Sequence, residues 1–182
     1  MACTYSFGGN LLDCKESAGG VKEIYIIDRA FVTAYTVNVT TKVIDTITLS
    51  GVNKFKTYQL RRQVASMNTT VTTSDTAGTT FYSTDVTFTI PKMSAAKRLE
   101  LLALAVGNMA VIVRDNNNTY WALGLENPVT LTAGSAGTGT NFGDANGYTY
   151  TLQDLGFTAP SEINRSILSD IIDSNISLPL PV

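Results

Sequence analysis

The first part of the chain alternates between apolar and polar residues. VKEIYIID (21–28) is rich in apolar β-branched residues, FVTAYTVNV (31–39) alternates for part of its length, and KVIDTITLS (42–50) alternates more clearly. Alternation with a period of two is typical of half-buried strands, and the short gaps between these segments indicate turns. The pattern therefore predicts three strands between residues 21 and 50.

Two long segments rich in threonine follow. KFKTYQLRRQVASMNTTVTTS (54–74) and TTFYSTDVTFTIP (79–91) flank the turn cluster SDTAG. Threonine and aromatic residues suit a pleated surface, so the pattern predicts a β-hairpin whose arms are longer than most strands. Because such arms bury little by themselves, we expect a neighbouring subunit to cover them.

The period changes after Pro91, where SAAKRLELLALAV (94–106) predicts a helix that Ser94 caps and Gly107 ends. Four residues follow the spacing i, i+3, i+4, i+7: Leu99, Leu102, Ala103 and Val106. Three more widen this apolar stripe: Leu101, Leu104 and Ala105. We therefore expect the helix to contact a sheet on one side and another chain on part of the other, with an ordinary core helix as the alternative.

Strands are predicted again in the second half, at 108–115, 119–127, 128–132 and 148–155. The glycine-rich stretch TAGSAGTGTNFGDANGYT (132–149) is expected to be a mobile loop between the last two strands. The final segment PSEINRSILSDIIDSNI (160–176) has the spacing of an amphipathic helix, and an extended arm is the alternative.

These elements together predict a mainly β fold. The expected architecture is an antiparallel β-sandwich or barrel with a long β-hairpin and one flanking helix. The length of 182 residues fits one domain that buries about 70% of its unfolded surface. We expect an N-terminal arm (1–20), a single β domain (21–158) that contains the helix 94–106, and a C-terminal helix or arm (159–182).

Composition excludes several classes of function. The chain has no histidine, which excludes Ser-His-Asp triads, Cys-His dyads and the usual zinc sites. The net charge of −2 leaves no basic field that would hold a nucleic-acid backbone. The sequence therefore predicts no catalytic site, no metal and no cofactor.

The sequence also carries signals about location. Its N-terminus lacks the basic and apolar regions of a signal peptide, and no apolar run approaches the length of a membrane span. We therefore expect no membrane association and free thiols at Cys3 and Cys14 in a reducing cytoplasm, with a disulfide between them as the alternative.

The glycine-rich stretch fails as a phosphate cradle. In the P-loop frame that begins at Gly134, a threonine stands where lysine is required and Asn141 stands where the Mg²⁺-binding hydroxyl belongs. The spacing of Gly137, Gly139 and Gly143 is one residue too long for a dinucleotide fingerprint. A strand follows where both motifs need a helix. We therefore interpret the stretch as a contact loop toward an adjacent subunit.

Three other patterns have structural explanations. DNNNTYWALGLE (115–126) follows the spacing of a calcium loop, but Tyr120 occupies the glycine position, which favours a tight hairpin turn. No pair of carboxylates stands out, so a hydrolase based on carboxylates alone would need an acidic pair in a pocket. Arg61 and Arg62 are interpreted first as an edge-strand device against stray pairing and second as a contact to an acidic partner.

Three stretches together resemble a known class of proteins. They are the segment from Cys14 through GGVKEIYIID (14–28), VIVRDNNNTYWALGLENPVTLT (111–132), and GTGTNFGDANGYTYTLQ (137–153), which leads into FTAPSEI. In this order they resemble virion structural proteins of tailed phages and prophages of Bacteroidales, including crAss-like phages. The long hairpin followed by a helix is similar to tail-tube and tail-hub architecture, in which a β-sandwich or barrel carries one flanking helix.

This resemblance implies a non-enzymatic structural subunit of a virion, which forms a homo-oligomeric ring in the tail or neck around a channel for double-stranded DNA. Its partners would be other tail, neck or portal-proximal virion proteins, and it would pass through the host cytoplasm during assembly. The alternative is a head-associated decoration or fibre-type protein. The candidate contacts between subunits are Arg61, Arg62, Phe81, Tyr82, Gly134, Gly137, Gly139 and Phe142.

Overall fold

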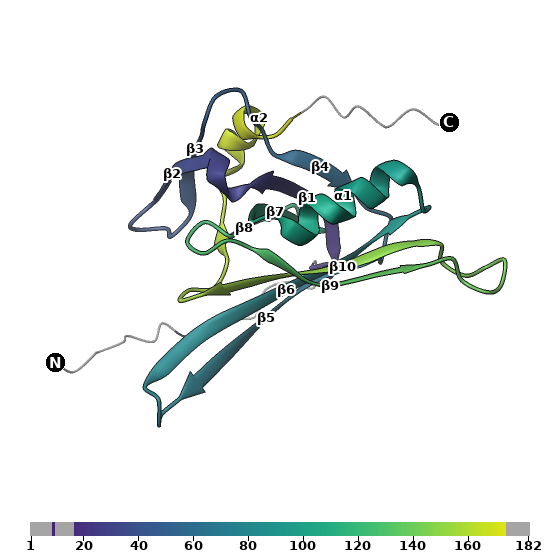
Figure 1. Ribbon diagram of the computed structural model, residues 1–182. Helices are drawn as coiled ribbons and strands as arrows, with labels where there is room; N and C mark the ends of the chain where they lie inside the picture. Colours follow the sequence, from purple (N-terminus) through teal and green to yellow (C-terminus); the bar gives the residue numbers. More distant parts are fainter. Residues whose placement is uncertain (1–8, 10–16, 174–182) are drawn as a thin grey trace.

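The computed structural model describes Gly9 and residues 17–173 (Figure 1). Cys3 and Cys14, and with them the expectation of free thiols, lie outside the described residues, as do most of the expected N-terminal arm and residues 174–182. The described residues form a mainly β fold with antiparallel sheets, one helix between strands and a short C-terminal helix, which confirms the predicted fold class.

Three groups of strands make up the fold. The five-stranded sheet has the order β11 (Ser161–Glu162), β8 (Tyr120–Leu123), β7 (Met109–Asp115), β1 (Val21–Asp28) and β4 (Lys56–Gln59). The four-stranded sheet has the order β5 (Ala65–Ser74), β6 (Thr79–Pro91), β10 (Gly147–Gly156) and β9 (Thr130–Gly137). β2 (Val32–Val37) and β3 (Ile44–Leu49) form a separate hairpin, and a 3-10 turn (Arg29–Phe31) links it to β1.

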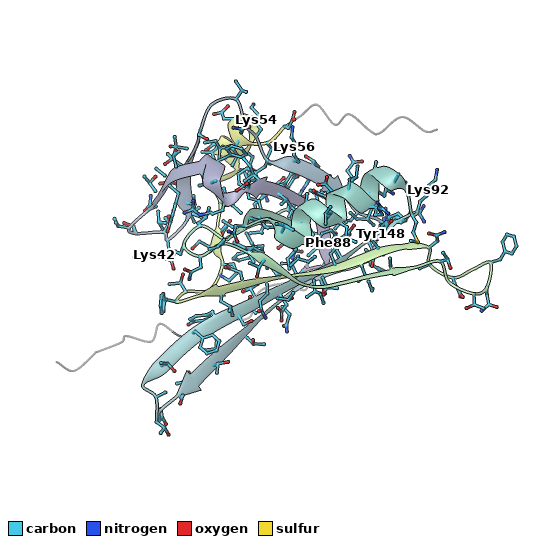
Figure 2. The ribbon with its side chains drawn as sticks, in the orientation of Figure 1. Lys42, Lys54, Lys56, Phe88, Lys92 and Tyr148 are labelled. Atoms are coloured by element: carbon cyan, nitrogen blue, oxygen red, sulfur yellow. The ribbon has the colours of Figure 1, made fainter. Side chains whose placement is uncertain are left out.

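The five-stranded sheet is buried on both faces, because two hydrophobic cores lie against it. Ile24 and Val111 on one face pack with residues of the four-stranded sheet, including Phe88 and Tyr148, which Figure 2 labels. A second cluster covers the other face: Tyr25, Ile27, Ala110 and Ile112 of the sheet pack with Ile44, Ile47, Phe55 and Ile163. Successive side chains of a strand point to opposite faces, which explains why β1 and β7 are almost continuously apolar.

Helix α1 (Ala95–Val106) confirms the predicted helix and its cap, since the Ser94 hydroxyl accepts a hydrogen bond from the Lys97 amide. The side of the helix that contacts the protein differs from the side that the spacing singled out. Leu104 is buried and Leu101 is partly buried against the first core. The exposed fractions on the opposite side are large: 63% at Leu99, 62% at Leu102 and 81% at Val106.

The long hairpin β5–β6 is confirmed, but its first arm begins at Ala65 and not at residue 54. The preceding strand β4 pairs with β1 in the other sheet. Between them the chain turns at Gln63, which has a φ of +62° and lets the backbone cross from one sheet to the other. Arg61 and Arg62 therefore lie in this connection and not in the hairpin.

The first part of the glycine-rich stretch belongs to strand β9, and its end belongs to β10. β9 continues through Gly137, so that Gly134 pairs with Tyr150 and Gly137 pairs with Gly147. The small residues of β9 let α1 lie close to it: a Cβ on Gly134 would meet the Leu101 side chain at 3.5 Å. The loop is therefore restricted to residues 138–146, and β10 follows it as the predicted strand.

The described part of the C-terminal segment contains much less helix than its spacing predicts. It forms β11, a 3-10 turn (Arg165–Ile167) and the four-residue helix α2 (Leu168–Ile171). The Ile163 amide donates to the Tyr120 carbonyl at 2.8 Å and the Asn164 amide donates to the Ile44 carbonyl at 2.9 Å. These bonds, together with the burial of Ile163 in the second core, hold the backbone extended where a helix was expected.

Candidate assembly interface

The four-stranded sheet ends in two open edges, β5 and β9. Neither ASMNTTVTTS of β5 nor TLTAGSAG of β9 contains a charged residue or a proline, and most residues of both strands are exposed. Proteins usually guard such edges with charges, prolines, bulges or a covering segment, because an open strand edge pairs readily with another chain. Both edges of this sheet lack the charge and proline guards.

The direction of the free hydrogen-bonding groups of β5 follows from one bond. The Val64 carbonyl accepts from the Thr89 amide at 3.1 Å, so Val64 faces β6. Because backbone groups alternate in direction along a strand, every second residue after Val64 also faces β6. The residues in between direct their amide and carbonyl groups outward: Ala65, Met67, Thr69, Val71 and Thr73.

The tip of the β5–β6 hairpin extends beyond the rest of the sheet (Figure 1). β10 pairs with β6 only from Tyr82 to Pro91, which leaves Phe81 and the residues nearer the turn without a third strand. Threonine hydroxyls link the two arms, with 2.9 Å between Thr69 Oγ1 and Thr84 Oγ1. Phe81 is 38% exposed and Val71 is 56% exposed. The hairpin therefore projects from the sheet and exposes apolar side chains, and its charged residues are Asp75 in the turn and Asp85 in β6.

Hydrogen bonds from backbone amides to the side chain of Asp144 close the glycine loop 138–146. The Asp144 carboxylate accepts from the amides of Thr140 and Asn141, each at 2.7 Å. These two bonds hold the pKa of Asp144 below its ordinary value. Gly139 has a φ of +70°, which favours glycine at that position. Phe142 lies fully exposed in this closed loop.

The eight candidate contact residues border different surfaces. Arg61 lines a hollow of about 530 Å³ with Lys92 and the glycine-loop residues 143–146. Gly134 and Gly137 lie in the β9 edge, whereas Phe81 and Tyr82 lie toward the opposite end of the sheet. The structure thus brings Arg61 and the glycine loop together, whereas Phe81 and Tyr82 of the hairpin lie away from both. The apolar outer side of α1 belongs to none of these groups. The sequence predicts that part of the helix contacts another chain, but no helix residue was among the eight candidate contacts.

Lys97 adds to the positive charge near Arg61. Burial, followed by the charges of Lys92 and Arg61, lowers the pKa of Lys97 from its ordinary value. Its ammonium donates to the carbonyls of Pro91 and Lys92, which holds it at the start of α1. This end of the four-stranded sheet is therefore cationic.

Carboxylates gather at a second hollow of about 460 Å³, which Glu126, Asp154 and Glu162 line. Burial, and to a lesser degree the charge of Glu126, raise the pKa of Asp154, although this carboxylate accepts from the Gly124 amide at 3.4 Å. The sequence set an acidic pair in a pocket as the requirement for a carboxylate hydrolase, and Glu126 and Asp154 both line this hollow. The backbone bond to Gly124 also gives Asp154 a role in the turn after β8.

In the turn after β7, the side-chain oxygens of Asp115 and Asn118 accept hydrogen bonds from other groups of the protein. Asp115 accepts from the Thr119 amide at 2.8 Å and from the Trp121 indole at 3.2 Å. Asn118, with a φ of +64°, accepts from the Arg114 guanidinium. These bonds form the tight turn between β7 and β8 that the sequence predicts. Among the described residues, no group of three or more His, Cys, Asp and Glu could hold a metal ion.

An ion pair near this turn makes stability depend on pH. Burial raises the pKa of Glu23, but hydrogen bonds from Tyr25 and Arg114 outweigh it and bring the pKa below its ordinary value of 4.5. A carboxyl group with a lowered folded-state pKa stabilises the protein above its unfolded pKa and loses this contribution as pH falls through the folded value. We expect Glu23→Gln to destabilise the protein at pH 7 and to have a progressively smaller effect below about pH 4.5.

Urea denaturation from pH 7 to pH 3 measures this difference, with Glu162→Gln, at an exposed glutamate, as the control. An effect of Glu23→Gln that is constant across this range would contradict the assignment.

None of the helices in the described part of the chain is long and apolar enough to cross a membrane.

No family model and no curated protein matches the chain. Among solved structures, a protein from the virion of a native gene transfer agent particle is similar, with 12% sequence identity and a TM-score of 0.37. The match covers 58% of this chain and 88% of that chain. At this score the likeness does not establish a common fold.

Proposed function

We propose that the chain is a non-enzymatic structural subunit of a phage-like virion and that it assembles with copies of itself into a ring. The observation that carries this proposal is the pair of open, uncharged edges on one sheet. Pairing β9 of one copy with β5 of the next would satisfy the hydrogen-bonding groups at both edges. The resemblance of the three sequence stretches to tailed-phage virion proteins supports the same role.

The strand directions suit a cyclic arrangement. β5, β6, β10 and β9 alternate in direction, because each neighbouring pair is antiparallel. β9 therefore runs opposite to β5. In a ring all copies have the same orientation relative to the axis, so β9 meets the next β5 in antiparallel direction as well. One continuous antiparallel sheet would result, with the same type of ladder within and between copies.

The face of the four-stranded sheet that points away from the core suits a channel for DNA. It carries hydroxyl pairs between neighbouring strands, with 3.2 Å between the side chains of Thr87 and Thr151 and 3.0 Å between those of Thr89 and Thr149. Hydroxyls carry no positive charge, and the carboxylate of Asp85 lies on the same face, so double-stranded DNA would pass without its phosphates being retained. We therefore place this face toward the channel and the ring in the tail or neck, with other tail, neck or portal-proximal proteins as neighbours.

In the proposed junction, where β9 of one copy pairs with β5 of the next, the candidate contacts lie on both sides. Gly134 and Gly137 lie on the β9 side. The hairpin pair Phe81 and Tyr82 lies beside the β5 side. Gly139 and Phe142 lie in the glycine loop, and Arg61 lines the hollow beside it. Arg62 follows Arg61 in the connection between β4 and β5.

Val71→Pro tests the edge pairing. The Val71 amide points away from β6, so proline removes an outward donor without removing a bond within the hairpin. We expect the variant to keep its fold by circular dichroism and to lose its oligomers in light scattering coupled to size-exclusion chromatography. Val71→Thr, which keeps both the amide and the branched side chain, is the matched control and should assemble. Assembly of Val71→Pro at the wild-type concentration would count against pairing through β5.

The alternative role is a head-associated decoration or fibre-type virion protein, which can also have a high β content. Cryo-electron microscopy of particles that contain the chain would decide between the two. Density on the tail axis supports the ring, and density on the capsid shell supports the alternative.

A further inference from the structure

The outer side of α1 is an apolar surface that the described residues leave uncovered. Leu99, Leu102 and Val106 are each more than half exposed. Three leucine and valine side chains on one side of a 12-residue helix are unusual for a surface that faces water. The opposite side of α1 packs in the first core, through Leu101 and Leu104.

The position of α1 in the sandwich shows what lies next to that surface. Leu101 lies over Gly134 of β9, so the helix covers the core-side face of the β9 edge (Figure 1). Glu100 contacts the Tyr58 hydroxyl of β4, and Ala103 lines a hollow beside it, so this flank faces the five-stranded sheet. At about 100° per residue, Leu102 and Ala105 lie on the opposite flank. That flank lies beside the open edge of β9.

We propose that this flank of α1 packs on β5 of the next copy, so that each junction contains both a strand pair and a helix–strand contact. The proposal rests on the proposed ring. A strand added to β9 continues the same sheet and presents alternate side chains on the core-side face, next to α1. Leu102 and Ala105 then contact the added strand, and Leu99 and Val106 extend the apolar surface away from it.

β5 has suitable side chains on the required face. Met67 pairs with the buried Val86, so Met67 points to the core side of the sheet. Alternation places Thr69 and Val71 on the same face. Val71 is 56% exposed because the hairpin extends beyond the strands that shelter Met67. β5 is uncharged, and Arg98 is the charged residue of the helix flank. An arginine side chain can lie along apolar surface with its methylene groups while its guanidinium stays in water, so the contact does not require Arg98 to be buried.

Cysteine cross-linking tests which face of β5 meets α1. The background replaces Cys3 and Cys14 with serine, and Leu102→Cys is combined in turn with a cysteine at one position of β5. A disulfide between copies is expected for at least one of the core-side substitutions Met67→Cys, Thr69→Cys and Val71→Cys, namely the one that the register between copies brings within about 7 Å of residue 102. The matched controls Asn68→Cys, Thr70→Cys and Thr72→Cys point to the other face and should not cross-link. Rings that form without core-side cross-links, or with cross-links only in the controls, overturn the contact and leave the ring in place.

Leu102→Asp provides a second readout. The variant should need at least about tenfold more protein to assemble, with an unchanged melting temperature of the monomer, because the side chain contacts only the neighbour. Val39→Asp introduces the same charge at a residue that is 84% exposed in the turn between β2 and β3, outside the four-stranded sheet, and it should assemble normally. Normal assembly of Leu102→Asp overturns the inference alone. A chain that stays monomeric at every concentration overturns both this inference and the proposed ring.

Discussion

Gly124→Ala is expected to lower the free energy of unfolding by about 3 kcal/mol or more. Gly124 follows β8 and has a φ of +78°, a conformation that L-residues adopt at a cost. A Cβ at this position would lie 2.5 Å from the Met109 carbonyl oxygen and 2.9 Å from a methyl group of Val129. The Met109 backbone cannot move away freely, because it exchanges two hydrogen bonds of 2.9 Å with Val129.

Urea denaturation measures this loss, and Gly137→Ala is the matched control. Gly137 has no atom within 4 Å of the position of a Cβ and no positive φ. Alanine should therefore change stability there by no more than about 0.5 kcal/mol, as at other exposed positions. Equal losses at Gly124 and Gly137 would show that the close approach at Gly124 is not what makes glycine necessary.

Phe88→Ala is the second substitution with a large expected effect, a loss of about 3 to 5 kcal/mol. Phe88 is fully buried between the two sheets, and its ring lies 5.2 Å from that of Tyr150 and 6.3 Å from that of Tyr58. Alanine would leave a cavity at the point where β6, β10 and β4 meet. Because the four-stranded sheet depends on this core, we expect the variant to lose near-ultraviolet circular dichroism at a lower temperature than the wild type.

Phe142→Ala is the control for this prediction, since Phe142 is fully exposed. Its melting temperature should match that of the wild type. A Phe88→Ala variant as stable as Phe142→Ala would mean that the two sheets do not pack through this core.

The sequence predicts elements that depend on local signals. Residues 94–106 begin with a serine cap and are followed by the terminating Gly107, and the structure has α1 at Ala95–Val106. The turn between β7 and β8 follows from an Asp-Asn run that tolerates positive φ, and Asn118 adopts it. The cluster SDTAG predicts the turn of the long hairpin, since its residues favour turns wherever they occur.

Features that depend on distant partners could not be predicted in the same way. α1 has apolar residues on most of its sides, so the spacing of these residues alone does not determine whether Leu104 or Leu102 faces the core. Alternation in residues 54–74 does not show that the chain changes sheets at Gln63. Ile163 and Ile171 have helical spacing, but the second core binds them from a strand end and a short helix.

The interface depends on distant partners as well. Whether β5 is an edge strand depends on where β6 and β10 lie, and no property of ASMNTTVTTS alone reveals it. The absence of charge in β5 and β9 is visible in the sequence. Its meaning becomes clear only once both strands are known to be edges of the same sheet.

The two open edges also determine whether the assembly stops growing. Head-to-tail pairing of β9 with β5 has no built-in end point, because every added copy presents a new open β5 or β9. Only the rotation between neighbours limits growth, and a rotation that misses closure gives a filament of unlimited length. Substitutions that change the twist of the four-stranded sheet should therefore convert a closed assembly into fibres, even where they leave each copy fully folded.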